Sequence, residues 1–227
     1  MGPRSALALV AFSALLFPSP GASQTRLVDQ GTFVVLKDGS PVLTESFRIS
    51  RGDAGVITAT ASHMADGEQT ATSLTTDSLG TPLRYELRVR KQGASVMDLI
   101  AIAGAGRLRS RASAAGGNEL MKEYLLVPGR SVILDHGVLH QLYFLPLGNR
   151  SGSVQVIEPL ASRTSKATLA ARGLEPIQIA GRSVTATHYS LSGPAGQYEF
   201  WADAQGRLLR VDVPAEGLSA TREELPR

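Results

Sequence analysis

The stretch LRYELRVR, residues 83–90, decides the fold of this chain. Every second residue in it is apolar, beginning at Leu83, and the residues between them are charged. Because successive side chains of a β-strand point to opposite faces, this alternation predicts a strand with one buried and one solvated face. Such a strand is typical of an antiparallel sheet that faces water on one side.

Similar segments lie on both sides of this strand, separated by short turns. Asp38-Gly39 and Asp66-Gly67 stand between two such segments, and Asp-Gly favours a hairpin because a type I′ turn needs two residues at positive φ. The strands predicted in this part of the chain cover residues 32–37, 42–50, 56–64, 69–76, 83–91, 95–102 and 107–114. Seven consecutive strands joined by short turns indicate an antiparallel meander.

The middle of the chain changes character. Residues 119–127 fit a helix or a strand, and the flanking glycines and proline favour a strand. Residues 136–145, HGVLHQLYFL, predict an apolar helix that Asp135 caps and Pro146 stops. Further strands are predicted at residues 154–159, 166–174, 184–191, 197–203 and 207–213, and residues 217–227 as a last edge strand or a frayed tail.

These elements together predict the fold class. We expect a mainly β protein with one large curved antiparallel sheet, a half-barrel, and one apolar helix packed on its concave face. The segments 1–23 and 24–227 are expected to be a signal peptide and a single β-rich domain.

Residues 1–23 have the pattern of a secretory signal peptide. Arg4 gives the positive start, residues 5–17 are apolar and uncharged, and small residues precede an expected cleavage between Ser23 and Gln24. The alternative is an uncleaved anchor, but the apolar run is shorter than the ~20 residues that a spanning helix needs. No later segment is long and apolar enough to span, so the mature chain is expected to lack a transmembrane segment.

Composition narrows the classes further. The chain has no cysteine among 227 residues, which excludes a disulfide framework, thiolate metal sites and a cysteine nucleophile. An exported chain without cysteine favours a bacterial periplasmic or otherwise exported protein. Without Arg4 the 23 basic residues become 22 against 20 acidic ones, a net charge of +2, so nucleic-acid binding is not indicated.

No catalytic motif is present. The chain lacks the Gly-x-Ser-x-Gly, Ser-x-x-Lys and P-loop patterns, and we expect neither a catalytic residue nor a cofactor. His136 and His140 stand four residues apart, which on a helix would place both rings on one face as weak metal-ligand candidates. The spacing alone is more often structural, because Gly137 stands where a zinc protease has its Glu.

Basic residues gather on two of the predicted strands. Around these strands seven positive charges, including Lys91, stand against Glu86 and Asp98. If both strands turn their arginines to the same side, the sheet would attract anionic material. The alternative is an ordinary solvated face. The arginines predicted for such a contact are Arg84, Arg88, Arg90, Arg107, Arg109 and Arg111.

The predicted strands are rich in Ala, Ser and Thr, which leaves room on the sheet's buried face for a helix or an apolar ligand. The side chains predicted to line that space are Leu139, Leu142, Tyr143 and Phe144 from the helix and Tyr85 and Leu87 from the sheet.

The layout resembles the half-barrel of bacterial lipoprotein-localisation factors (LolA/LolB-like). The motifs QGTFVV at residues 30–35, followed by Asp38-Gly39, and WADAQGRLLRV at residues 201–211 are similar to uncharacterised exported bacterial β-proteins. The resemblance implies a cavity for acyl chains between sheet and helix. It implies no catalytic residues.

The function expected from these features is binding of an apolar or lipid-like ligand between sheet and helix in the cell envelope. One alternative is an envelope interaction protein that contacts a protein partner or anionic material through the arginines or an exposed strand edge. A second is a metal-assisted hydrolase built on His136 and His140.

Overall fold

The computed structural model describes residues 25–147 and 150–226, so the expected signal peptide lies outside the described residues. These described residues form one sheet of fifteen strands and three short 3-10 helices. The strands are β1 (Arg26–Lys37), β2 (Ser40–Arg51), β3 (Ile57–Ala65), β4 (Glu68–Thr76), β5 (Pro82–Lys91), β6 (Ala94–Gly104), β7 (Arg107–Ala114), β8 (Glu119–Leu125), β9 (Ser131–Ile133), β10 (Gly152–Glu158), β11 (Arg163–Ile179), β12 (Arg182–Gly193), β13 (Gly196–Ala202), β14 (Leu208–Val213) and β15 (Leu218–Arg222). The 3-10 helices are η1 (Asp53–Gly55), η2 (Leu139–Phe144) and η3 (Pro214–Glu216).

The strand order is β8-β7-β6-β5-β4-β3-β2-β1-β15-β14-β13-β12-β11-β10-β9. Nearly all neighbours are antiparallel and consecutive in sequence, which confirms a large open antiparallel sheet. The exception in direction is β9, which pairs parallel with β10. The exception in sequence distance is β1, whose residues 33–37 pair with β15. The sheet therefore ends at β8 on one side and at β9 on the other.

Two predicted hairpins are confirmed by their backbone angles. Asp38 and Gly39 have φ of 48° and 81°, and Asp66 and Gly67 have 52° and 76°, as a type I′ turn requires. These turns fix the register of β1 against β2 and of β3 against β4. Local turn chemistry thus determines the pairing in this half of the sheet.

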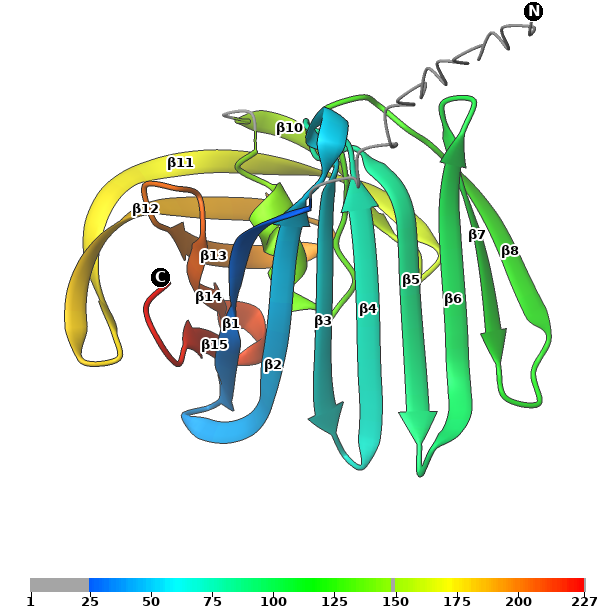
Figure 1. Cartoon of the computed structure of the whole chain (residues 1–227), viewed down its shortest axis with the longest axis horizontal. Coiled ribbons are helices and arrows are strands. Elements are labelled where there is room, and N and C mark those ends of the chain that lie inside the picture. The colour runs from blue at the N-terminus through cyan, green and yellow to red at the C-terminus, as the bar shows by residue number, and fades with distance from the viewer. Residues whose placement is uncertain (1–24, 148–149, 227) are drawn as a thin grey trace, which may run out of the picture.

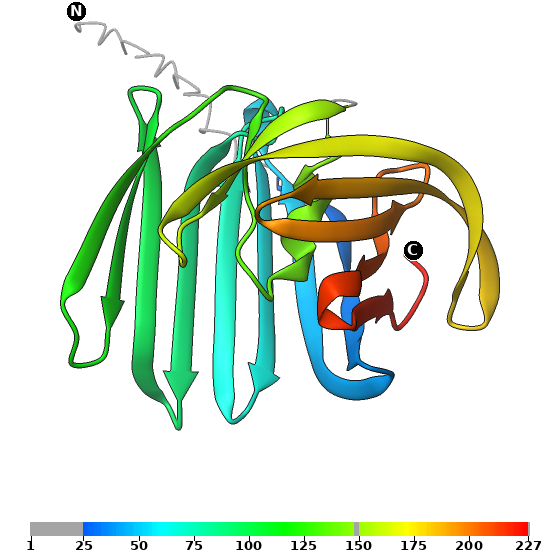
Figure 2. The same ribbon diagram turned by 180° about the vertical axis from the view of Figure 1, so that it is seen from behind.

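The sheet folds over on itself. In Figure 1, β2 to β6 run upright and β10 to β13 run across behind them, and Figure 2 shows the same crossing from the other side. The η2 segment lies between the two halves in both views. The inward side chains of the two halves and of η2 form one large buried core.

The predicted helix at residues 136–145 is wrong in length and type. Only Leu139–Phe144 is helical, as a six-residue 3-10 helix. Gly137 has a φ of 78°, which interrupts a right-handed helix before η2 begins. All six residues of η2 are buried, so the segment is a core filler and not an amphipathic helix with a solvent face.

The end of the chain also differs from expectation. β15 is an internal strand between β1 and β14, and not an edge. A buried ion pair joins it to β1: Arg222 Nη2 donates to Asp29 Oδ1 at 2.8 Å. β15 is therefore the strand that connects the first and last parts of the sheet.

Candidate functional site

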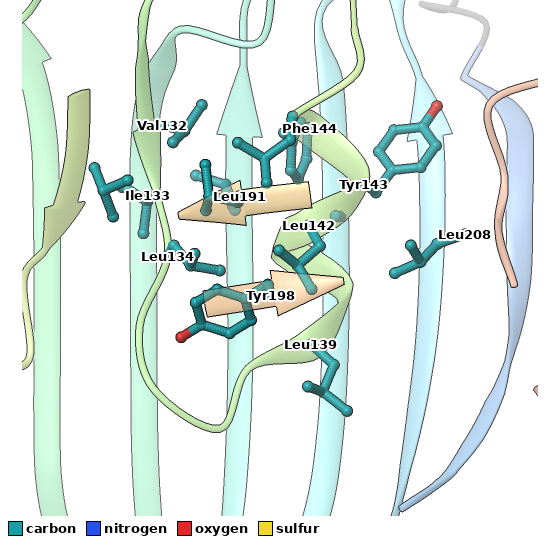
Figure 3. Close-up of a cluster of buried hydrophobic side chains, with 14 of the residues drawn as sticks. Val132, Ile133, Leu134, Leu139, Leu142, Tyr143, Phe144, Leu191, Tyr198 and Leu208 are labelled. Carbon is teal, nitrogen blue, oxygen red and sulfur yellow. The ribbon is translucent and has the colours of Figure 1, made fainter. Parts of the chain in front are cut away.

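The side chains predicted to line a ligand space lie in the packed core. Leu139, Leu142 and Phe144 belong to the buried cluster that Figure 3 shows, together with residues of both sheet halves, and Tyr143 lies edge-on to Phe144 at 5.4 Å between ring centroids. Tyr85 and Leu87 of β5 belong to the same core. The structure brings these residues together in one core, where they pack against other protein groups.

A buried carboxylate holds η2 to the sheet. Glu45 of β2 accepts N–H groups from Leu139 at 3.1 Å and from His140 at 2.8 Å, and its Oε1 lies 3.3 Å from His140 Nδ1. His63 on β3 lies opposite Glu45, with Nδ1 3.9 Å from Oε2. Burial alone would raise the pKa of Glu45, but the His140 charge and the backbone donors outweigh it and lower that pKa.

A second buried carboxylate lies before η2. Asp135 does not cap a helix as predicted; its Oδ1 accepts the N–H of Leu160 at 3.0 Å. Its own backbone N–H donates to Gln141 Oε1 at 2.7 Å, and Tyr85 faces its carboxylate. Burial raises the pKa of Asp135 to about 6; the Leu160 N–H and the nearby Tyr85 hydroxyl only partly offset this, and Glu158 adds to it.

We expect Asp135→Asn to stabilise the protein at pH 7.5. The folded state holds the Asp135 proton up to about pH 6 while the unfolded chain releases it near its ordinary 3.8, so wild-type stability falls as pH rises between these values. A shift of this size corresponds to about 3 kcal/mol above pH 6 and to almost nothing at pH 4. Urea unfolding of both proteins at pH 4 and 7.5 checks this, and an equal difference at both pH values would contradict it.

The two histidines proposed as metal candidates are not on one helix face. His140 is buried beside Glu45, whereas His136 lies before η2, is 70% exposed and points its Nδ1 to Glu216 at 3.4 Å. Among the described residues, no group of three or more His, Cys, Asp or Glu side chains is placed to hold a metal ion. The described residues therefore provide no metal centre for the alternative of a metal-assisted hydrolase.

The arginines predicted to contact anionic material lie on β5 and β7 and share the outer face of the sheet. Arg84 pairs across with Ile102, and Ile102 with Arg109, so Arg84 and Arg109 stand in one row. Arg90 follows a register shift in β5. The other five arginines have acidic partners: Arg84 and Arg88 with Glu86, Arg107 and Arg109 with Glu123, and Arg111 with Glu119.

These ion pairs change the charge expected of this face. β8 contributes Glu119 and Glu123, which lie outside the segment that carries the predicted excess. The pairs are exposed and each contributes little stability, about 0–1 kcal/mol. With these acidic partners counted, the outer face carries only a small net positive charge. Its contact with anionic material stays a prediction.

A groove of about 750 Å³ lies where the sheet fails to close. We call it the seam groove. One wall is the end of β8 and the link that follows it; the other is the start of β10 and β11. Its lining residues are Leu125, Val127, Arg130, Ser151, Gly152, Ser153, Val154, Gln155, Thr164, Ser165 and Lys166.

Side-chain hydrogen bonds connect the two walls of the seam groove. Gln155 of β10 donates from Nε2 to Leu125 O at 3.0 Å. Ser131 donates to Gln155 Oε1 at 2.8 Å and accepts the N–H of Val127 at 2.8 Å. Arg130 donates to Ser151 O at 2.8 Å and to Ser153 O at 3.4 Å. The groove is therefore a fixed feature between the two sheet ends.

The seam groove combines apolar and basic groups. Leu125 is 60% exposed and Val127 is 42% exposed. Among the residues that the structure describes, Arg130 and Lys166 are the charged lining residues, and none of the lining residues is acidic. Sequence reasoning missed these residues, because they come from three separate segments and carry no motif. The available signal was the apolar run ending at residues 125–127 beside Pro128-Gly129, where the strand leaves the sheet.

Two other hollows are smaller. One of about 450 Å³ lies between residues 27–32 and 223–225, and one of about 360 Å³ lies on the faces of β2 to β4. None of the three hollows is lined by the predicted residues of η2 or β5. The seam groove is the largest of the three, and it leaves the side chains of Leu125 and Val127 exposed on its wall.

The fold, one open sheet that folds over on itself around a core, is β-barrel-like. Residues 129–223 match the model of a domain of unknown function (DUF6134), a span that contains β9 to β15 and the basic residues of the seam groove. No match was found among curated proteins.

Two solved structures are similar. A β-barrel-like protein of the domain of unknown function DUF1849 from Brucella abortus is 12% identical with a TM-score of 0.57, over 88% of this chain and 97% of that chain. This likeness shows the fold. A DUF1089 family protein from Pseudomonas aeruginosa is 18% identical with a TM-score of 0.37, over 92% and 98%. The expected resemblance to uncharacterised β-proteins is supported at the level of the fold. Neither of these two structures is described as a lipoprotein-localisation factor.

Proposed function

We propose that this protein binds an elongated apolar ligand in the seam groove. The single observation that carries the proposal is an open groove of about 750 Å³ that leaves Leu125 and Val127 exposed beside two basic side chains. Its volume lies within the range of small-molecule sites, about 300–1,000 Å³. An apolar chain in the groove would remove these two side chains from water, which is favourable.

The proposal moves the ligand away from the space between sheet and η2. Leu142 and Tyr85 are fully buried by other protein groups, so an interior ligand would have to displace core side chains. Interiors are packed at close to crystal density, and displacing such groups costs free energy. The seam groove needs no such rearrangement.

The proposal also retains an exported location, on the strength of residues 1–23 alone. The helices of the described residues are all too short or too polar to cross a lipid bilayer. We infer an exported binding protein with an apolar ligand.

We expect Leu125→Asp to weaken binding of a neutral apolar probe, N-phenyl-1-naphthylamine, by about tenfold or more, since burying a leucine contributes about 1.5–3 kcal/mol. Fluorescence titration of protein purified without detergent measures this. Leu174→Asp is the matched control, because Leu174 is 75% exposed on β11 and does not line the groove. Equal loss in both variants, or no binding by the wild type, would contradict the proposal.

A further inference from the structure

The distribution of charge around the seam groove defines its ligand more closely. The whole chain has 20 acidic residues, yet the groove lining contains none of them and has Arg130 and Lys166. An isolated apolar chain gains nothing from two cations. A ligand with a negative group at one end would use both features of the groove.

The two cations differ in how they are held. Arg130 is fixed by hydrogen bonds to the backbone carbonyls of Ser151 and Ser153, so its guanidinium stays on the groove wall. Lys166 is exposed on β11, and within the described part of the chain its side chain forms no hydrogen bond or ion pair. Lys166 is therefore the cation available to a ligand, and Arg130 adds positive potential from a fixed position.

Hydroxyl groups lie beside these cations. Ser151 and Ser153 lie on the Arg130 side, and the exposed Thr164 lies two residues before Lys166 on the same face of β11. Hydroxyl donors next to cations suit the oxygens of a carboxylate or a phosphate, since charge-assisted hydrogen bonds are the stronger ones. The apolar part of the groove, Leu125 and Val127, lies on the wall opposite Lys166.

We propose that the ligand is a single-chain anionic amphiphile, with its acyl or alkyl chain along the β8 wall and its carboxylate or phosphate at Lys166 and Arg130. This inference rests on the proposed function, because it specifies the ligand of the same groove. It names a chemical class that a free fatty acid or a phosphate-bearing lipid could supply.

Four probes with the same dodecyl chain test the headgroup: dodecanoate, dodecyl phosphate, dodecanol and dodecyltrimethylammonium. Each is titrated below its micelle concentration by displacement of the neutral naphthylamine probe. We expect the two anions to bind about tenfold or more tightly than the alcohol and the ammonium, the size of one charge-assisted hydrogen bond. A preference between dodecanoate and dodecyl phosphate distinguishes a fatty-acid ligand from a phosphate headgroup.

Lys166→Glu gives the decisive comparison. We expect it to abolish most of the preference for anions while dodecanol still binds, and Lys37→Glu, at the exposed end of β1, should leave the preference unchanged. Equal affinity for all four probes, or a preference that survives Lys166→Glu, would overturn the anionic headgroup and leave the apolar groove in place. Failure of every probe to bind would overturn the groove itself, and with it both proposals.

Discussion

Replacing Glu45 with leucine is expected to lower the free energy of unfolding by about 3–5 kcal/mol, as for other buried charges that lose their partner. The leucine would leave the N–H groups of Leu139 and His140 without an acceptor inside the core. It would also leave the fully buried His140 ring without its carboxylate. The loss arises from unpaired polar groups, because the leucine itself fills a similar volume.

Glu45→Gln separates the charge from the hydrogen bonds. The amide keeps one oxygen acceptor but places an NH2 group against the second backbone donor, so we expect an intermediate loss of about 1–3 kcal/mol. Glu68→Leu is the control, since Glu68 forms an exposed pair with Lys91 at 3.2 Å and should cost under about 1 kcal/mol. Urea unfolding checks all three variants. A loss at Glu45→Leu no larger than at Glu68→Leu would show that Glu45 does not hold η2.

Local patterns in the sequence were sufficient for the first half of the sheet. The alternation at residues 83–90 and the turns at Asp38-Gly39 and Asp66-Gly67 act within a few residues, and the structure confirms them. The pairing of Phe33 with Arg222 joins distant parts of the chain. Alternation with a period of two residues indicates which face of a strand is buried, but it does not identify a partner strand that is distant in the sequence.

The η2 segment shows why apolar spacing misled the prediction. Leu139 and Leu142 stand at helical spacing, but His140 and Gln141 between them are also buried, so no polar face exists. A segment covered on all sides has no amphipathic period, and burial then follows from the two sheet halves around it. The α-helix predicted from residue 136 depended on that period.

The seam groove was beyond sequence reasoning for a different reason. It exists because β9 has only three residues and pairs with β10, so that the sheet ends there and faces β8. Neither Leu125 nor Lys166 belongs to a recognisable sequence motif. Their proximity results from where the sheet stops, a global property of the fold.

Breaking the ion pair between Asp29 and Arg222 is expected to lower the free energy of unfolding about as much as Glu45→Leu does. The two residues lie 193 positions apart and join β1 to β15. Arg222 Nη2 also donates to Gln30 O at 2.9 Å, and its guanidinium lies 5.0 Å from the Phe47 ring centroid. Arg222→Met should cost about 3–5 kcal/mol at pH 7.5, because the Asp29 carboxylate would remain buried without its ion-pair partner.

The double variant Asp29→Asn with Arg222→Met tests the cause of that loss. Burial already outweighs Arg222 and raises the pKa of Asp29, so the free energy cost of Arg222→Met should come from the stranded carboxylate and should fall when Asp29 is made neutral. We expect the double variant to recover most of the stability, since replacing both partners of a buried pair is often neutral. Arg88→Met, which breaks an exposed pair with Glu86, should cost under about 1 kcal/mol. If the single and double variants unfold at the same urea concentration, the loss comes from the packing of Arg222 on Phe47 and not from the buried charge.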